Sequence, residues 1–181
     1  MQKKNSRYLR IAVFSSFLAA MSIVFGKYLA INLGEVIRIS FENTPIIFAG
    51  IAFGPIVGAV VGIVADLVGC LLVGYAINPV ITIGAAAIGA VSGVFCFFVR
   101  KREGVSRYIL IICAIFLSHI IGSVLIKTIG LAAFYAMPYH VLLLWRALNY
   151  LIVGALETLI LVPLLSNRRI NDEIKKLGGK T

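Results

Sequence analysis

The sequence predicts an all-α integral membrane protein, a single domain over residues 1–181 in which six transmembrane helices form one bundle and both termini are cytoplasmic. Composition is the first reason: 61% of the chain is hydrophobic and 13% is charged, against about 45–50% and about 25% in soluble domains. The mean hydropathy is +1.04. Most of the 17 Lys and Arg also lie in three clusters between long apolar stretches.

Six apolar stretches have the composition of membrane helices, which need roughly 20 residues to cross a core about 30 Å thick. The first follows basic residues as a signal peptide does, but it is long and another apolar stretch comes next, so an uncleaved helix is expected. The second is short and ends at Gly54-Pro55, because Pro interrupts a helix. The expected spans are about 8–30, 41–53, 55–73, 80–99, 108–131 and 140–166.

The three basic clusters, in residues 3–10, 100–107 and 168–180, decide whether the short second stretch crosses the membrane. If it crosses, all three clusters face the cytoplasm. If it does not, the 100–107 cluster falls outside, against the positive-inside tendency. Six crossings are therefore expected. The charge placement indicates membrane topology, with lipid as the surrounding partner, and not a nucleic-acid surface.

Small residues recur at four-residue spacing on three predicted helices: Ala12, Ser16 and Ala20, then Gly58 and Gly62, then Gly89 and Gly93. Such residues let helix backbones approach closely in lipid. Each set either packs inside the bundle or, for the first helix, docks another membrane subunit.

Four basic residues lie outside the clusters, near the predicted outer side: Lys27, Arg38, Lys127 and Arg146. An ionisable residue within a membrane is expensive and suggests function, although lysines near helix ends also extend to the interface. Together the four would form a positive basin for an anionic ligand.

Asp66 lies near the middle of the third span. It either forms a structural pair, with Arg146 as a candidate, or accepts a two-pronged hydrogen bond from an amino-substituted ring. Glu157, deeper in the last span, is expected to be paired structurally, and His119 is expected to be a satisfied core histidine.

Amides and aromatic side chains gather near the same predicted outer face: Asn43, Asn78 and Asn149, with Tyr75, Tyr135, Tyr139 and Trp145. Amides donate and accept hydrogen bonds, which suits the edge of a heterocycle. The aromatic residues either form an interfacial belt or stack on a flat ligand.

Motifs for nucleotide binding, zinc-dependent hydrolysis, dithiol redox chemistry and serine hydrolysis are absent from the sequence. We therefore expect no catalytic residues, no metal site and no cofactor. Cys70, Cys96 and Cys113 are odd in number and lack metal-ligand spacing, so they are expected to be small core residues. Without an ATP motif, the chain cannot drive transport alone unless an ion gradient does so.

One stretch, RISFENTPIIFAGIAFGPIVGAVVGIVAD from Arg38 to Asp66, resembles the substrate-binding S components of energy-coupling factor (ECF) vitamin transporters. It is most similar to the folate branch, as are Leu131, Tyr135 and Pro138 followed by Arg146 and Asn149. One departure is the loop before the fourth span. It reads GYAINPVIT, where the folate branch often has Gly-aromatic-Pro-Gly-Phe-Thr.

The resemblance implies a subunit of the bacterial cytoplasmic membrane that captures a vitamin at the outer face. It docks on a module of one transmembrane coupling subunit and two ATPases, and topples to release its ligand inside. The docking residues it implies are Ala12, Ser16 and Ala20. Folate is the expected ligand, bound by Arg38, Asn43, Asp66, Tyr75, Asn78, Lys127, Tyr135, Arg146 and Asn149. The basin suits its carboxylates, and amides, Asp66 and aromatic rings suit its flat pterin.

Two alternatives remain. The altered loop at Gly74 to Thr82 favours an S component for another vitamin or a modified base. Asp66 and Glu157 within membrane spans favour an ion-coupled secondary transporter that works alone.

Overall fold

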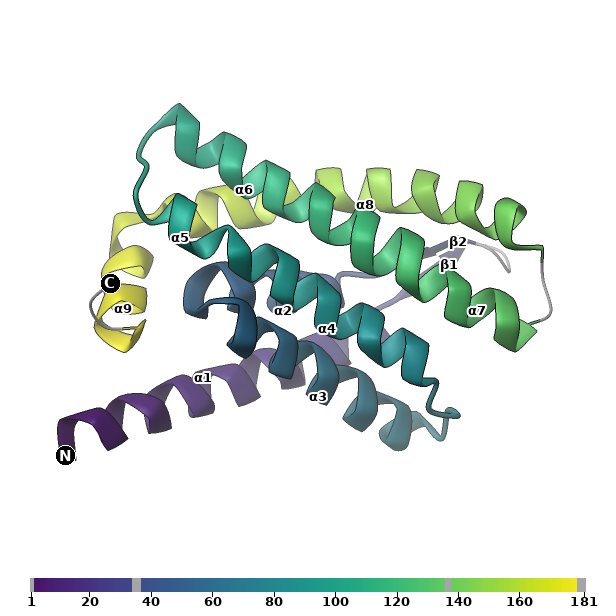
Figure 1. The fold of residues 1–181 in the computed structure, drawn as a ribbon, viewed down its shortest axis with the longest axis horizontal. Coiled ribbons are helices and arrows are strands. Elements are labelled where there is room, and N and C mark those ends of the chain that lie inside the picture. The colour runs from purple at the N-terminus through teal and green to yellow at the C-terminus, as the bar shows by residue number, and fades with distance from the viewer. Residues whose placement is uncertain (1, 34–36, 136–137, 179–181) are drawn as a thin grey trace.

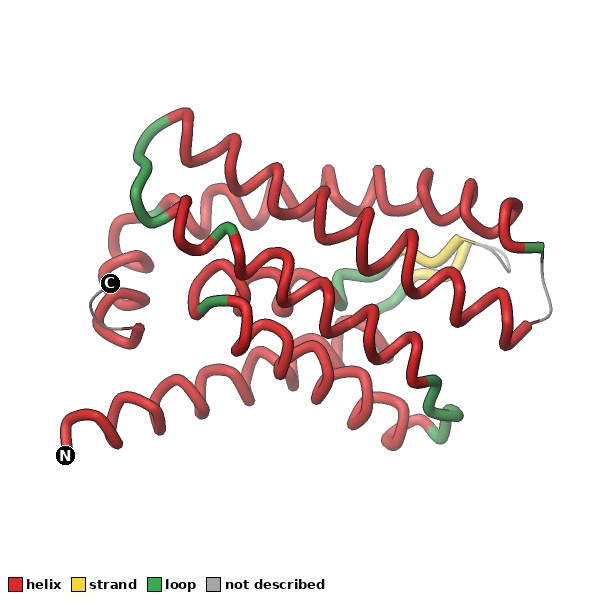
Figure 2. The backbone as a smooth tube through the Cα atoms, in the orientation of Figure 1, coloured by secondary structure: helices red, strands yellow, loops and turns green. Residues whose placement is uncertain are grey.

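The computed structural model describes residues 2–33, 37–135 and 138–178 as a helical bundle with one small β-hairpin (Figures 1 and 2). The elements in chain order are α1 Gln2–Lys27, β1 Ile31–Leu33, β2 Ile37–Ile39, α2 Asn43–Phe53, α3 Pro55–Val73, α4 Pro79–Val94, α5 Cys96–Val99, α6 Val105–Ser118, the π-helix η1 His119–Ile126, α7 Lys127–Tyr135, α8 Tyr139–Ser166 and α9 Arg168–Gly178.

Within the described residues, five helices are long and apolar enough to cross a membrane: Ser6–Lys27, Pro55–Val73, Pro79–Val99, Val105–Phe134 and Tyr139–Ser166. The predicted helical membrane bundle is confirmed at this level. The sixth predicted span corresponds to α2, which is apolar but has only 11 residues. A crossing by α2 and the cytoplasmic side of the termini stay predictions.

The three basic segments lie at one end of the bundle. Figure 1 shows the N-terminus, the α5–α6 connection and α9 at its left end, and α2 running back toward that end before α3 reverses. The predicted topology needs this grouping, because it places all three segments on one side of a membrane.

The turn between α2 and α3 lies where the sequence predicts a break. Gly54 has a φ of 99°, a conformation that favours glycine, and its N–H donates to Gly50 O at 2.8 Å. Pro55 then occupies the first turn of α3, where its missing N–H has no cost.

Glycines let α3 and α4 pack backbone against backbone. A Cβ on Gly58 would lie 2.4 Å from Gly89 O, and one on Gly89 would lie 2.0 Å from Gly58 O. A Cβ on Gly62 would lie 2.2 Å from Ala85 O. The predicted glycine pairs therefore pack inside the bundle, which is the close-approach role of small residues in membrane helices.

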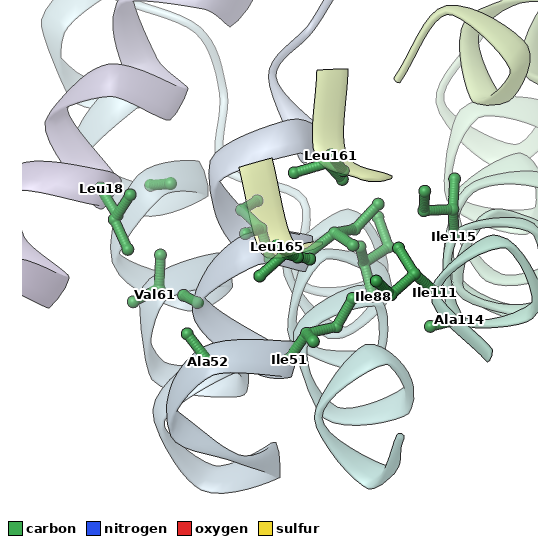
Figure 3. Close-up of a cluster of buried hydrophobic side chains, with 14 of the residues drawn as sticks. Leu18, Ile51, Ala52, Val61, Ile88, Ile111, Ala114, Ile115, Leu161 and Leu165 are labelled. Carbon is green, nitrogen blue, oxygen red and sulfur yellow. The ribbon is translucent and has the colours of Figure 1, made fainter. Parts of the chain in front are cut away.

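An apolar core joins α1, α2, α3, α4, α6 and α8. Figure 3 shows part of this cluster, with Ile51 of α2, Ile88 of α4, Ile111 and Ile115 of α6 and Leu161 of α8 drawn together. Large apolar side chains are also exposed along the outer faces of the long helices. Such a surface suits a lipid environment, since a soluble protein rarely exposes apolar patches of this extent.

Three features differ from the prediction. The segment between the first two predicted spans contains a hairpin that was not predicted, in which Ile31 pairs with Ile39 and Leu33 with Ile37. Strands of three residues are too short to show an alternating pattern. The C-terminal basic cluster forms α9, whose Ile174 joins the core. Cys70 and Cys96 are buried as predicted, but Cys113 is exposed on α6, so its placement in the core was wrong.

Candidate functional site

A small polar cavity of about 20 Å³ lies inside the bundle, bounded by the end of α1, the start of α2, and parts of α3, α4 and α7. Its polar lining brings together two ammonium groups, two carboxylates, an amide and a hydroxyl. They belong to Lys27, Lys127, Glu42, Asp66, Asn43 and Ser22. Charged groups inside an apolar bundle are costly, so their convergence on one cavity indicates a binding site.

Lys127 begins α7 and is buried, with 6% of its surface exposed. Its Nζ lies 3.4 Å from Glu42 Oε1, so the ammonium is partly neutralised. A Cβ on Gly84 of α4 would lie 2.5 Å from Lys127 Cγ, so the glycine leaves the space that the lysine stem occupies.

Lys27 reaches the same cavity from the last turn of α1. A Cβ on Gly69 of α3 would lie 3.0 Å from Lys27 Cε, so the aliphatic part of this lysine also packs against a glycine. The ammonium lies 5.3 Å from the centroid of the Tyr75 ring, a cation–π distance. This contact places Tyr75, which is exposed, beside the cavity residues.

Asp66 lines the cavity from α3, and its Oδ2 accepts a 2.6 Å hydrogen bond from Thr82 Oγ1 of α4. The suggested pairing of Asp66 with Arg146 is wrong. Arg146 donates instead to Ser123 O, from Nε at 3.1 Å and Nη2 at 2.7 Å. Spacing along each helix could not show this, because it does not say which helices are neighbours.

The π-helix η1 makes the Arg146 contact possible. In this register the N–H of Lys127 donates to Gly122 O, five residues back. That N–H is then not available to Ser123 O, and the guanidinium supplies two donors to this carbonyl. Single π-helical turns within α-helices occur frequently at functional sites.

A chain of buried polar side chains runs from the cavity into the bundle. Asn43 Nδ2 donates to Ser123 Oγ at 3.4 Å, and Ser123 Oγ lies 3.3 Å from His119 Nδ1. His119 Nε2 lies 2.6 Å from Glu157 Oε2, and Thr44 Oγ1 donates to Glu157 Oε1 at 2.9 Å. The predicted structural pairing of Glu157 is confirmed, and His119 is satisfied in the core as predicted.

The other predicted ligand residues are placed differently. Asn78 caps α4, where its Oδ1 accepts from Val80 N and its Nδ2 donates to Gly130 O, both at 3.0 Å. Asn149 is buried on α8. The side chains of Arg38 and Tyr135 lie outside the described residues.

The structure thus brings Asn43, Asp66 and Lys127 of the predicted set to one cavity. It adds Lys27 and Glu42, which the predicted set of ligand residues omits. The sequence held a signal for each: Lys27 is a lone cation at the end of a span, and Glu42 directly precedes the predicted ligand residue Asn43.

The stripe of small residues on α1 is not covered by the rest of the described chain. Ala12, Ser16 and Ala20 are all exposed, and the Ser16 hydroxyl is satisfied by a 2.9 Å hydrogen bond to Ala12 O. The stripe therefore does not pack within the described bundle, and its docking of another membrane subunit stays a prediction.

Residues 10–165 match the family model of the ECF transporter, substrate-specific component. The chain belongs to this family. This family comprises the substrate-specific components of ECF transporters, and the five long apolar helices of the described chain fit a multi-pass membrane protein.

Two curated proteins are similar to parts of this S component. The folate transporter FolT of Clostridium novyi is 30% identical over 103 residues, which cover 56% of this chain and 58% of that protein. An uncharacterized protein of Mycoplasma pneumoniae is 35% identical over 72 residues, 40% of this chain and 25% of that protein. The matches span less than two thirds of the length of either relative.

Two solved structures have the same fold. FolT bound with folic acid aligns over 94% of this chain and 97% of its own, with a TM-score of 0.69 and 24% identity. The S component of a bacterial ECF transporter aligns over 95% and 99%, with a TM-score of 0.59 and 21% identity.

Proposed function

We propose that this S component binds folate at the outer end of its bundle and delivers it by docking on an ATP-driven coupling module in the bacterial cytoplasmic membrane. The observation that carries the proposal is the convergence of Lys27, Glu42, Asn43, Asp66 and Lys127 on one cavity within an apolar bundle. The similarity to a curated folate transporter supports folate as the ligand.

The chemistry of the cavity is complementary to folate. The ammonium groups of Lys27 and Lys127 suit the carboxylates of its glutamate part, because charge-assisted hydrogen bonds are the stronger ones. Asp66 and Asn43 suit the amino and ring nitrogen edge of the pterin, which needs both acceptors and donors. Tyr75, whose ring lies next to the Lys27 ammonium, is proposed to cover a flat ring of the ligand.

The cavity must widen to admit such a ligand. Its volume is about 20 Å³, whereas pockets for drug-sized molecules hold about 300–1,000 Å³. Binding therefore separates the walls and exchanges contacts such as the Lys127–Glu42 ion pair for contacts with the ligand. Arg38, Asn78, Tyr135, Arg146 and Asn149 remain proposed contacts of the widened site.

Docking on the coupling module is proposed to use the exposed stripe of Ala12, Ser16 and Ala20. Small side chains permit close helix approach in lipid. The module, by the family's pattern, has one transmembrane coupling subunit and two ATPases. These supply the ATP-binding motif that this sequence lacks.

The first test is a titration of folate against the purified protein in detergent. We expect saturable nanomolar binding, about −12 kcal/mol. Thiamine and riboflavin serve as comparison ligands, and mass spectrometry identifies whatever co-purifies. Tight binding of another vitamin without folate binding would refute the folate assignment. It would favour an S component for another vitamin, the alternative suggested by the altered Gly74 to Thr82 loop.

A second test addresses the coupling module. Vesicles that contain this chain alone should take up no folate, and vesicles that also contain the coupling subunit and both ATPases should take it up when ATP is inside. Uptake by the chain alone, driven by an ion gradient, would contradict the proposal and support an ion-coupled transporter.

A further inference from the structure

We propose that His119 and Glu157 are positioning residues for the ligand site: through Ser123 they orient the amide of Asn43 so that its Oδ1 offers a hydrogen-bond acceptor to an N–H donor of the ligand. The inference rests on the proposed function, since it concerns the same cavity. It assigns a role to a buried histidine–glutamate pair that neither ligand chemistry nor docking uses.

The pair joins three elements at the cavity wall. Glu157 of α8 is fully buried, and its two carboxylate oxygens contact His119 of η1 at 2.6 Å and Thr44 of α2 at 2.9 Å. On its other side the His119 ring reaches Ser123, also in η1, at 3.3 Å. Ser123 in turn accepts from Asn43, next to Thr44 at the start of α2.

The donor directions along this chain follow from the carboxylate. A carboxylate only accepts hydrogen bonds, so His119 Nε2 carries the hydrogen that faces Glu157. In the neutral ring Nδ1 is then the acceptor, because the hydrogen bond at one ring nitrogen fixes the role of the other. The Ser123 hydroxyl donates to Nδ1, which leaves its oxygen to accept from Asn43 Nδ2.

The amide of Asn43 is thereby held in one of its two orientations. Nδ2 faces Ser123, and Oδ1 has no hydrogen-bond partner within the described residues, although Asn43 is fully buried and lines the cavity. A buried acceptor without a partner costs free energy. A ligand N–H placed in the cavity removes this cost, whereas a ligand acceptor at the same point is rejected.

Stability alone does not account for the pair. Replacing a buried pair of ionisable side chains by well-packed apolar residues of similar volume is often neutral or stabilising. Both His119 and Glu157 lie within membrane-spanning helices, where ionisable side chains are expensive. Fixing a hydrogen-bonding orientation in the cavity is a role that apolar residues cannot perform.

The test is a double-mutant cycle on folate binding with Asn43→Ala and Ser123→Ala. We expect Ser123→Ala to weaken binding about tenfold, the size of one hydrogen bond. In the Asn43→Ala background the same change should cost almost nothing, because its effect passes through Asn43. Glu157→Leu, which removes the acceptor that fixes the hydrogen of His119 on Nε2, should behave like Ser123→Ala. The matched control is Ser118→Ala, a buried serine whose Oγ donates only to Ala114 O of its own helix, and it should not change affinity.

Solution NMR of the protein with ¹⁵N-labelled histidine gives a readout without ligand. We expect His119 to carry its hydrogen on Nε2, and its Nδ1 resonance to move in Ser123→Ala but not in Ser118→Ala. Independent, additive costs in the binding cycle, or a hydrogen on Nδ1, would overturn the inference. If the wild-type protein binds no folate but shows the expected Nδ1 response, the folate assignment fails and the positioning relay stands.

Discussion

Lys127 illustrates how one residue is tolerated inside an apolar bundle. Its stem passes over Gly84, which offers no side chain in the way, and its ammonium meets Glu42 at 3.4 Å. Buried charges persist when they are paired or used for binding. Lys127 is paired with Glu42 in this structure, and in the proposed complex an anionic ligand replaces Glu42 as its partner. Removal of the Lys127 charge is therefore the most informative substitution for ligand binding.

We predict that Lys127→Met weakens folate binding roughly ten- to a hundredfold, because a charge-assisted hydrogen bond is lost. Isothermal titration in detergent measures the effect. Lys101→Met serves as the control, since Lys101 is exposed in the α5–α6 connection at the other end of the bundle (Figure 1). Equal affinities of Lys127→Met and wild type would remove Lys127 from the site.

At the scale of elements, the helix faces that pack inside the bundle carry glycines, whereas the exposed stripe of α1 carries alanine and serine. The α3–α4 contact depends on glycines whose backbones touch, whereas the small residues of α1 face away from the bundle. Small residues thus serve internal packing between α3 and α4, and on α1 they are exposed to a possible partner helix. Each role has its own test.

Gly89→Ala is predicted to destabilise the bundle strongly, by about 3 kcal/mol or more, because overpacking of a tight core costs typically 1–3 kcal/mol and here the new Cβ would meet backbone. That Cβ would lie 2.0 Å from Gly58 O. Gly154→Ala is the comparison, since its Cβ would meet only the Phe116 ring, at 3.1 Å. Thermal unfolding in detergent should show a much larger loss for Gly89→Ala, and similar melting temperatures would argue against the tight α3–α4 contact.

Ser16→Trp is predicted to block uptake by the assembled transporter and to leave folate binding unchanged, because bulk on the stripe keeps the coupling subunit away. Phe17→Trp is the matched control. Phe17 is also exposed on α1 but lies beside the stripe, so this variant should retain uptake. Uptake and binding are measured on the same preparations. If Ser16→Trp transports normally, docking uses another surface.

At the scale of the whole molecule, the distribution of charge and the fold indicate the same orientation in the membrane. The basic N-terminal segment, the α5–α6 connection and α9 occupy one end of the bundle (Figure 1). Lys27 is the last residue of α1, and Lys127 lies in the second half of the span Val105–Phe134, so both are distant along their spans from the basic segments. The positive-inside tendency assigns the basic end to the cytoplasm. In this orientation the candidate site faces the outside, as the proposed capture of an external vitamin requires.

This polarity is testable by cysteine labelling in intact cells. In a background with Cys70, Cys96 and Cys113 replaced by Ala, we expect Ala76→Cys in the α3–α4 loop to react with a membrane-impermeant maleimide. Gly104→Cys in the α5–α6 connection should react only after the cells are opened. The reverse pattern would contradict this topology, because it requires either that α2 does not cross or that the N-terminus lies outside. Labelling of both positions in intact cells would refute a crossing by α4.

The sequence by itself determined the membrane class, the positions of the long helices, the break at Gly54-Pro55 and the family. These follow from local properties: apolar runs of membrane length, a backbone-restricted dipeptide, and motifs read in order. It also predicted Asn43, Asp66 and Lys127 as ligand residues, because polar groups in an apolar run suggest function, and the structure shows that all three line one cavity.

Only the tertiary structure decided which of these residues meet. It showed that Asp66 bonds to Thr82 and not to Arg146, and that Glu157 pairs with His119. It also added Lys27 and Glu42 to the cavity and left the α1 stripe exposed. The physical reason is that the spacing along a helix fixes which residues share its face but not which helix that face meets. The π-helical register of η1 and the glycine contacts of α3 and α4 set those neighbours, and both arise from packing between segments distant in the chain.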